Sequence, residues 1–203
     1  MIKIDALIDI FFKDLPWDQR VARIAECGYR YVETWGGGDA AVLKQIGTAG
    51  KACGVDLVSI VMNFATQENV APIRKENRQR FIEQMDQYAD HALAVGCRQG
   101  IVTTGQSAGG RSYQEQRAAL VDALRAAGEV VAKKGFRLNL EPLNTEVDHP
   151  GYFLADPREG VAIVKEVGLS NVRLLYDIYH MEIMTGNQTV FIEKNMEWIG
   201  HFH

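Results

Sequence analysis

The chain alternates short apolar runs with longer segments whose apolar residues recur every three or four positions. The short runs lie at residues 4–12, 29–35, 55–63, 98–104, 136–140, 172–176 and 199–203. Short apolar runs indicate buried strands, whereas the period of three to four indicates amphipathic helices. Strands that alternate with helices, without a break in composition, predict one α/β domain with parallel strands.

Capping and helix-stopping residues place the expected helices. Ser112 followed by Glu115 forms a capping box, and Asp156-Pro157 is a second start signal. Gly54 and other glycines close the periodic segments. We expect helices over residues 16–27, 41–52, 75–95, from 112 onward, 157–167 and 190–198, and a loop from the sixth strand through Gly186.

The number of strand–helix units bears on the choice of fold. About seven units are present, whereas a closed (β/α)₈ barrel has eight in about 250 residues. An open doubly wound sheet is the alternative, but the first turn lacks G-x-G-x-x-G and the polar candidates fall at several strand ends. We therefore expect residues 1–203 to form a single domain, an α/β (β/α)₈ TIM barrel that is C-terminally incomplete and lacks the eighth unit.

Composition and charge narrow the class of partner. The 203 residues are 47% hydrophobic and carry a formal net charge of −4, which argues against a nucleic-acid binder. We expect a small-molecule substrate and no nucleic-acid partner. The first residues begin a strand-like run that contains Asp5 and Asp9, and the three cysteines show no metal or redox spacing. These features lead us to expect a cytoplasmic protein with no membrane partner.

Three ligand-type residues fall at the ends of the last three strands. Glu141 follows 136–140, Asp177 follows 172–176, and His203 ends the last run. Carboxyl ends of parallel strands share one edge of the sheet, where sites are built. Two carboxylates and an imidazole suit a divalent cation, although acidic residues there also cap helices or pair with Arg. Because both carboxylates end apolar runs, a cation is the natural compensation for their charge.

Four motifs in this order resemble one enzyme group. They are Glu141-Pro142-Leu143-Asn144, then His149 to Leu154, then Tyr176 to Met181, and Ile199-Gly200-His201-Phe202-His203. Together they resemble the hydroxypyruvate isomerase and ketose 3-epimerase group of the xylose-isomerase-like barrels.

The resemblance implies a metal site and a set of catalytic residues. One divalent ion (Mg²⁺, Mn²⁺, Co²⁺ or Zn²⁺) would be bound by Glu141, Asp177, His203 and a Glu on the eighth strand, which this sequence does not contain. Glu141 would be a catalytic proton-transfer group, and Glu146 and His180 would bind substrate oxygens. Moving a proton beside a carbonyl needs such a base and an electrophile for the developing charge.

The implied activity is metal-dependent isomerisation of a small hydroxy-carbonyl compound or sugar by enediolate proton transfer. Hydroxypyruvate to tartronate semialdehyde is the leading reaction, and 3-epimerisation of a ketose is the alternative. Two readings belong to other classes: an endonuclease IV-like nuclease, which would need more ligands and a basic surface, and a non-catalytic or truncated barrel. Because seven strands leave open edges, we also expect a homo-oligomer.

Further polar residues have less certain roles. Glu33 suits either a site or a structural hydrogen bond, and His149 lies on a loop that either covers the site or does not. We expect His201 to be structural and to face the helical layer.

Overall fold

The strands and helices alternate as expected in a computed structural model, which describes residues 3–203. Within that range the strands are β1 (Asp5–Leu7), β2 (Tyr31–Thr34), β3 (Asp56–Val61), β4 (Gln99–Val102), β5 (Arg137–Leu140), β6 (Val172–Tyr176) and β7 (Ile199–Phe202). The α-helices are α1 (Trp17–Glu26), α2 (Ala40–Cys53), α3 (Arg78–Leu93), α4 (Tyr113–Ala132), α5 (Pro157–Val167), α6 (Ile178–Met184) and α7 (Gln188–Asn195). Three short 3₁₀ turns lie at Glu68–Val70, Lys75–Asn77 and Met196–Trp198.

The chain divides into two compact units. The first contains Met1–Met62 and Gln87–Gly100, and the second contains Asn63–Asp86 and Ile101–His203. Helix α3 and strand β4 each contribute residues to both units. All the residues proposed above as metal ligands or substrate contacts belong to the second unit.

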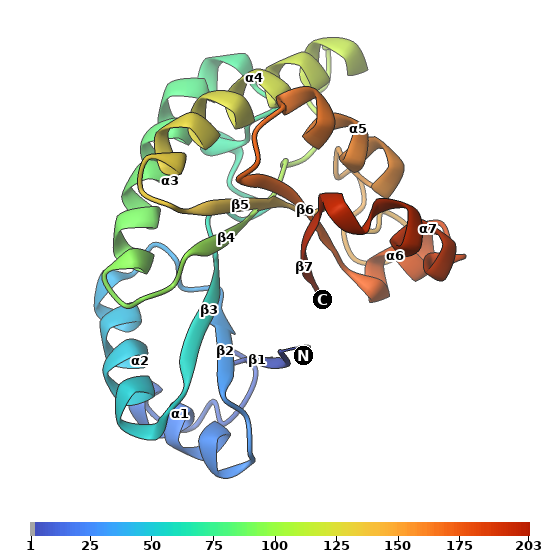
Figure 1. The fold of residues 1–203 in the computed structure, drawn as a ribbon. Helices are drawn as coiled ribbons and strands as arrows, with labels where there is room; N and C mark the ends of the chain where they lie inside the picture. The colour runs from blue at the N-terminus through green and yellow to red at the C-terminus, as the bar shows by residue number, and fades with distance from the viewer. Residues whose placement is uncertain (1–2) are drawn as a thin grey trace. The chain divides into compact units, whose positions relative to one another are not determined.

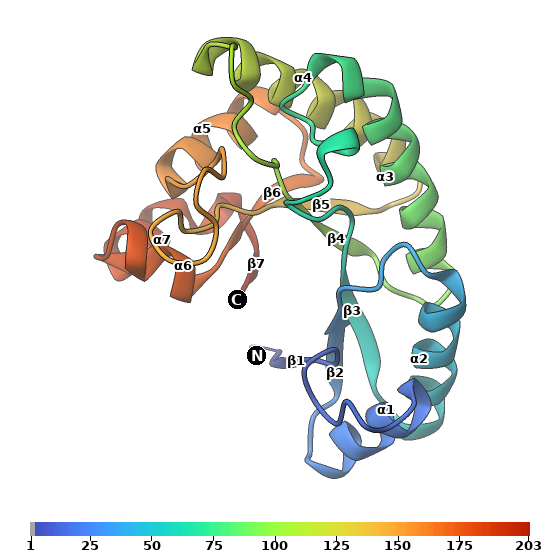
Figure 2. The same ribbon diagram turned by 180° about the vertical axis from the view of Figure 1, so that it is seen from behind.

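The first unit is a parallel β-sheet flanked by helices. Strand β1 pairs with β2, and β2 with β3, both in parallel. Helices α1 and α2 pack against each other, and α2 also contacts β3 (Figure 2). Asp39 accepts hydrogen bonds from the first turn of α2, and Gly54 ends that helix in the left-handed conformation.

The second unit repeats this arrangement with β5, β6 and β7. These strands are also parallel neighbours in chain order, and α5 packs against both α4 and β6 (Figure 1). An apolar cluster of Val161, Leu174, Tyr176 and Met181 fills the space between β6 and its helices. The strand ends that carry the polar candidates are therefore anchored on a packed core.

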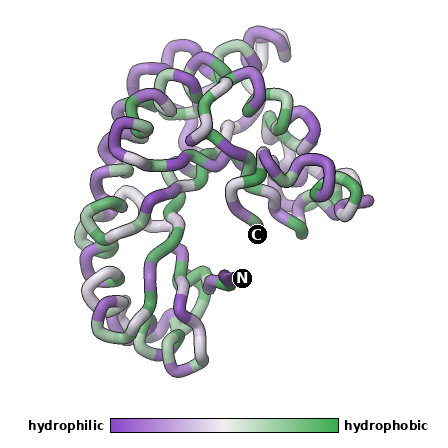
Figure 3. Tube along the Cα trace, in the orientation of Figure 1, coloured by the Kyte–Doolittle hydropathy of each residue, from purple (hydrophilic) through white to green (hydrophobic). Residues whose placement is uncertain are grey.

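Most expected elements are present, and the capping box is confirmed. The Ser112 side chain accepts a hydrogen bond from the Glu115 backbone, and the Glu115 side chain accepts one from Ser112 N. Figure 3 shows hydrophobic and hydrophilic segments alternating along the helices, as amphipathic periodicity requires. The expected parallel α/β class is confirmed as well.

The expectation of a loop through Gly186 is wrong for most of that segment. Helix α6 begins directly after Asp177, whose side chain accepts a hydrogen bond from His180 N at 2.9 Å. This helix has only seven residues, so its apolar pattern is too short to reveal a period. Helix capping, the alternative role considered above for acidic residues at strand ends, is therefore one that Asp177 fulfils.

Candidate metal and substrate site

Glu141, Asp177 and His203 each follow a strand of the second unit, and the backbone holds each one in place. Glu141 N donates to Val102 O at 3.0 Å, which extends the ladder one residue beyond β5. His203 N donates to Tyr176 O at 3.1 Å, and His203 O accepts from Ile178 N at 2.8 Å. The side chains are therefore presented by fixed backbone at strand ends.

The three side chains converge. His203 Nδ1 lies 3.6 Å from Glu141 Oε1 and 3.8 Å from Asp177 Oδ2. Both carboxylates belong to residues only 8% exposed. Within residues 3–203, neither carboxylate forms an ion pair with Lys or Arg, and their ion-pair partners are the imidazoles of His180 and His203. This arrangement fits a divalent cation, which would neutralise the pair.

Asp177 uses its two oxygens differently. Oδ1 accepts from His180 N and caps α6, while Oδ2 lies 3.8 Å from His203 Nδ1 and 3.9 Å from His180 Nε2. Ligand atoms of Glu141, Asp177 and His180 all lie within 4.8 Å of one another. By geometry alone, the imidazoles of both His180 and His203 lie close enough to these carboxylates to coordinate the same cation.

His180 is tied to the loop that follows β5. Its Nδ1 atom lies 2.7 Å from Asn144 Nδ2 and accepts from Asn144 N at 3.3 Å. Asn144 is fully buried, and its Nδ2 also donates to Asp148 Oδ2 at 2.7 Å. Asp148 accepts a further hydrogen bond from the Tyr179 hydroxyl at 2.8 Å.

These contacts shift the pKa values of the loop. The Asn144 amide and the Tyr179 hydroxyl hold the pKa of Asp148 below its usual value. Burial, and next the proximity of His180, lowers the pKa of His149, whose ring centroid lies 5.4 Å from that of His180. The loop thus presents a carboxylate and a largely uncharged imidazole beside His180 at neutral pH.

Tyr152 fixes the start of the same loop. Its hydroxyl donates to Glu141 O at 2.8 Å and accepts from Thr104 N at 2.8 Å. Burial raises the pKa of this hydroxyl well above its usual value, so it stays protonated. Sequence reasoning had not singled out Asn144, Asp148, Tyr152 or Tyr179, although three of them lie inside the quoted motifs.

Glu146 is not brought into the cluster. It lies exposed in the turn at residues 145–148, and within residues 3–203 its carboxylate has no hydrogen bond or ion pair. Its predicted contact with substrate stays a prediction, as do the roles predicted for Glu141, Asp177, His180 and His203.

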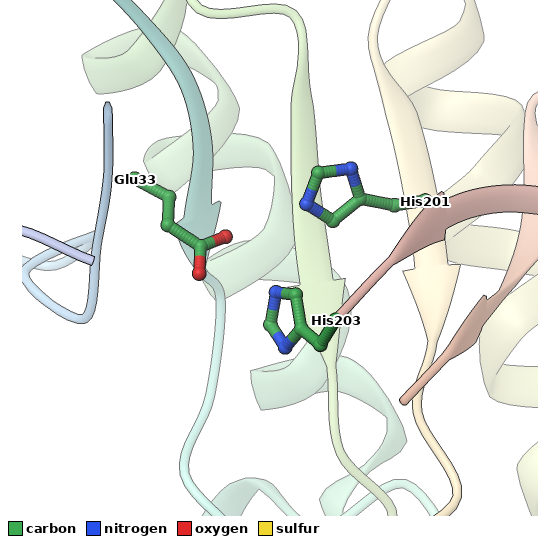
Figure 4. A group of neighbouring side chains, drawn as sticks. All are labelled: Glu33, His201 and His203. Atoms are coloured by element: carbon green, nitrogen blue, oxygen red, sulfur yellow. The ribbon is translucent and has the colours of Figure 1, made fainter. Parts of the chain in front are cut away.

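The expected orientation of His201 is wrong. The His201 and His203 rings lie on the same side of β7, with centroids 5.2 Å apart (Figure 4). Residues two apart on a strand share a face, so the alternation rule had been applied with the wrong period. Glu33, also drawn in Figure 4, is a buried residue of β2 in the first unit.

Comparison with known proteins places the fold. The sequence pattern of the xylose isomerase-like TIM barrel family matches residues 21–203. A solved structure described as an AP endonuclease, family 2, from Brucella melitensis superposes with a TM-score of 0.85 and 28% identity, over 100% of this chain and 78% of that one. The expected TIM-barrel fold class is therefore confirmed.

Named relatives point to isomerases. A putative hydroxypyruvate isomerase of Homo sapiens is 34% identical over 125 residues, 60% of this chain and 45% of that protein. This match therefore spans less than half of the human protein. The hydroxypyruvate isomerase of Escherichia coli is 27% identical over 99% of this chain and 78% of its own length. Proteins named as sugar epimerases also occur among the relatives and the solved structures. The expected resemblance to isomerases and epimerases is confirmed.

No helix within residues 3–203 has the length and apolar character needed to cross a membrane.

Proposed function

Because this chain belongs to the xylose isomerase-like TIM-barrel family, we propose that it is an isomerase of small hydroxy-carbonyl compounds that works with one divalent cation. The observation that carries the proposal is the convergence of His203 Nδ1 on Glu141 Oε1 and Asp177 Oδ2, at 3.6 and 3.8 Å. Hydroxypyruvate is the preferred substrate because relatives named hydroxypyruvate isomerase match the chain.

The metal ligands in this proposal are Glu141, Asp177 and His203. An ion at about 2.0–2.6 Å from each ligand atom leaves those atoms about 3–4 Å apart, and the distances above lie in that range. Held by these residues, a divalent cation would supply positive charge that stabilises the negative charge developing on the substrate during proton transfer.

Glu141 is the proposed base. Its Oε1 faces His203, while the second carboxylate oxygen is left to take a proton from the substrate carbon and return it to the neighbouring carbon. The isomerisation balances when the substrate's hydroxyl proton passes to its carbonyl oxygen. Burial of Glu141, at 8% exposure, keeps water from competing for that proton. His180, beside Asp177, binds a substrate oxygen.

The test combines metal binding with turnover. Calorimetric titration with Mn²⁺ should show one site per chain, and added Mn²⁺ should support conversion of hydroxypyruvate to tartronate semialdehyde, followed by NMR. Glu141→Gln should lower kcat by about 10²–10⁴-fold with an unchanged fold. Glu129→Gln, on the exposed side of α4, is the matched control and should leave turnover unchanged.

The outcome that overturns the proposal is equally concrete. If Glu141→Gln kept most of its activity on hydroxypyruvate and on a panel of ketoses, Glu141 would not be the base. If the unmodified chain acted on ketoses but not on hydroxypyruvate, the proposed site would be retained and the proposed activity would become that of an epimerase. Metal-dependent cleavage of abasic DNA without isomerase activity would favour the nuclease reading, which the description of the Brucella protein suggests.

A further inference from the structure

The orientation of the Asn144 side chain is fixed by its four polar contacts. Its Oδ1 accepts from the backbone N–H groups of Val147 and Asp148, both at 3.0 Å. An amide NH₂ cannot accept such bonds, so the opposite atom is the nitrogen. That nitrogen has two hydrogens, and two acceptors lie at 2.7 Å from it, Asp148 Oδ2 and His180 Nδ1.

Two donors therefore converge on Nδ1 of His180. One is the Asn144 amide, and the other is the backbone N–H of the same residue at 3.3 Å. A ring nitrogen that accepts hydrogen bonds carries no proton, and a neutral imidazole has one N–H. The proton must then be on Nε2, the nitrogen that lies 3.9 Å from Asp177 Oδ2.

We propose that Asn144 holds His180 as the Nε2–H tautomer, which makes His180 a hydrogen-bond donor in the site and excludes it from the metal ligands. A protonated Nε2 has no lone pair to offer a cation. His180 therefore does not coordinate the cation, although its ligand atom lies within 4.8 Å of those of Glu141 and Asp177. The imidazole that binds metal is His203.

The chemical consequence rests on the proposed function. During proton transfer next to a carbonyl, negative charge develops on a substrate oxygen, and a fixed neutral N–H donor stabilises it there. Asn144 acts through His180 and is a positioning residue. Asp148, held by the Tyr179 hydroxyl at 2.8 Å, in turn fixes the Asn144 amide.

A pair of variants isolates the tautomer. Asp148→Asn removes the charge but keeps an acceptor for the Asn144 amide, so His180 should keep its proton on Nε2. Adding Asn144→Asp to that variant retains an oxygen for the N–H groups of residues 147 and 148. It places a carboxylate oxygen against Nδ1, and the stronger charge-assisted bond draws the proton to Nδ1. The double variant therefore differs from Asp148→Asn only at the side chain of residue 144, where an oxygen replaces the NH₂ group.

The direct measurement is a long-range ¹H–¹⁵N spectrum of the histidine rings at neutral pH, with His180 assigned by its loss in His180→Gln. We expect an unprotonated Nδ1 and a protonated Nε2 in the unmodified chain and in Asp148→Asn, with the reverse in the double variant. Addition of Mg²⁺ should leave the proton on Nε2. A proton on Nδ1 in the unmodified chain, or loss of the Nε2 proton when Mg²⁺ binds, would overturn the proposal.

Turnover tests the donor role separately. Relative to Asp148→Asn, the double variant should lose about 10²-fold in kcat, with the same melting temperature. Unchanged kcat despite a reversed tautomer would refute the donor role. If the unmodified chain had no isomerase activity, the proposed function would fail, while the ring spectra would still decide the tautomer.

Discussion

The Nδ1 atom of His203 lies 3.6 Å from Oε1 of Glu141, although the two residues come from different strands. Asp177, from the strand between them, completes the group through its Oδ2 atom. One carboxylate oxygen of Asp177 is therefore committed to the site and the other to the first turn of α6. Substitutions at this residue can separate the two roles.

Asp177→Asn should weaken metal binding while leaving the fold intact. Asn caps helices about as well as Asp, so the melting temperature should change little. Loss of the charged oxygen should lower Mn²⁺ affinity by at least about tenfold. Asp177→Ala should lose the same affinity and also about 1 kcal/mol of stability, because the cap is removed. Equal stability of the two variants, measured by denaturant unfolding, would contradict the capping role.

Tyr152→Phe should destabilise the second unit. The Tyr152 hydroxyl joins Thr104 N to Glu141 O, and its removal leaves the Thr104 N–H buried without a partner. A cost of about 1–3 kcal/mol is expected for such a group. The measurement is urea unfolding, with Tyr179→Phe as the control, because the Tyr179 side chain is exposed. A loss no larger in Tyr152→Phe than in the control would show that Thr104 N finds another acceptor.

Gly200→Ala should be destabilising for lack of space. A Cβ at Gly200 would lie 2.2 Å from Asn139 Oδ1 and 2.7 Å from Arg173 Cβ. The strands would have to move, at a cost of about 1–3 kcal/mol. Gly109→Ala is the matched control, because a Cβ there meets nothing within 4 Å. Similar melting temperatures for both variants would mean that β7 has more room than the structure indicates.

The capping box should make stability depend on pH. Hydrogen bonds from the backbone and side chain of Ser112 lower the pKa of Glu115 in the folded chain. A lowered folded-state pKa contributes stability above the unfolded-state pKa, and that contribution is lost as pH falls through the folded-state value. Ser112→Ala should thus reduce the melting temperature more at pH 7 than at pH 3. An equal loss at both pH values would show that the Glu115 charge is not involved.

Much of the fold could be predicted from the sequence because its signals are local. The run at 172–176 matches β6 from end to end, and Ser112 with Glu115 marks the start of α4. The first run was predicted as a strand through Phe12, whereas β1 ends at Leu7 and turns follow. Apolar composition alone does not show where the chain leaves the sheet.

The candidate site was only partly predictable. Strand-end position was enough to select Glu141, Asp177 and His203, whose side chains do converge, although their function stays a prediction. The contact between Asn144 and His180 joins two loops through side chains, and no spacing rule encodes it. Family membership was recognisable because four motifs recur in order, and the match over residues 21–203 confirmed it.

The two compact units have a consequence for biosynthesis. The first unit needs residues 87–100 to be complete, and the second needs residues 63–86 together with everything from 101 to 203. A ribosome releases the chain from its N-terminus, so residues 63–86 emerge before any of their later partners exist. Helix α3, which contributes to both units, can form early from local hydrogen bonds, but its second-unit end stays exposed until the rest follows. Nascent chains halted between residues 100 and 203 should therefore be the ones that need chaperone protection.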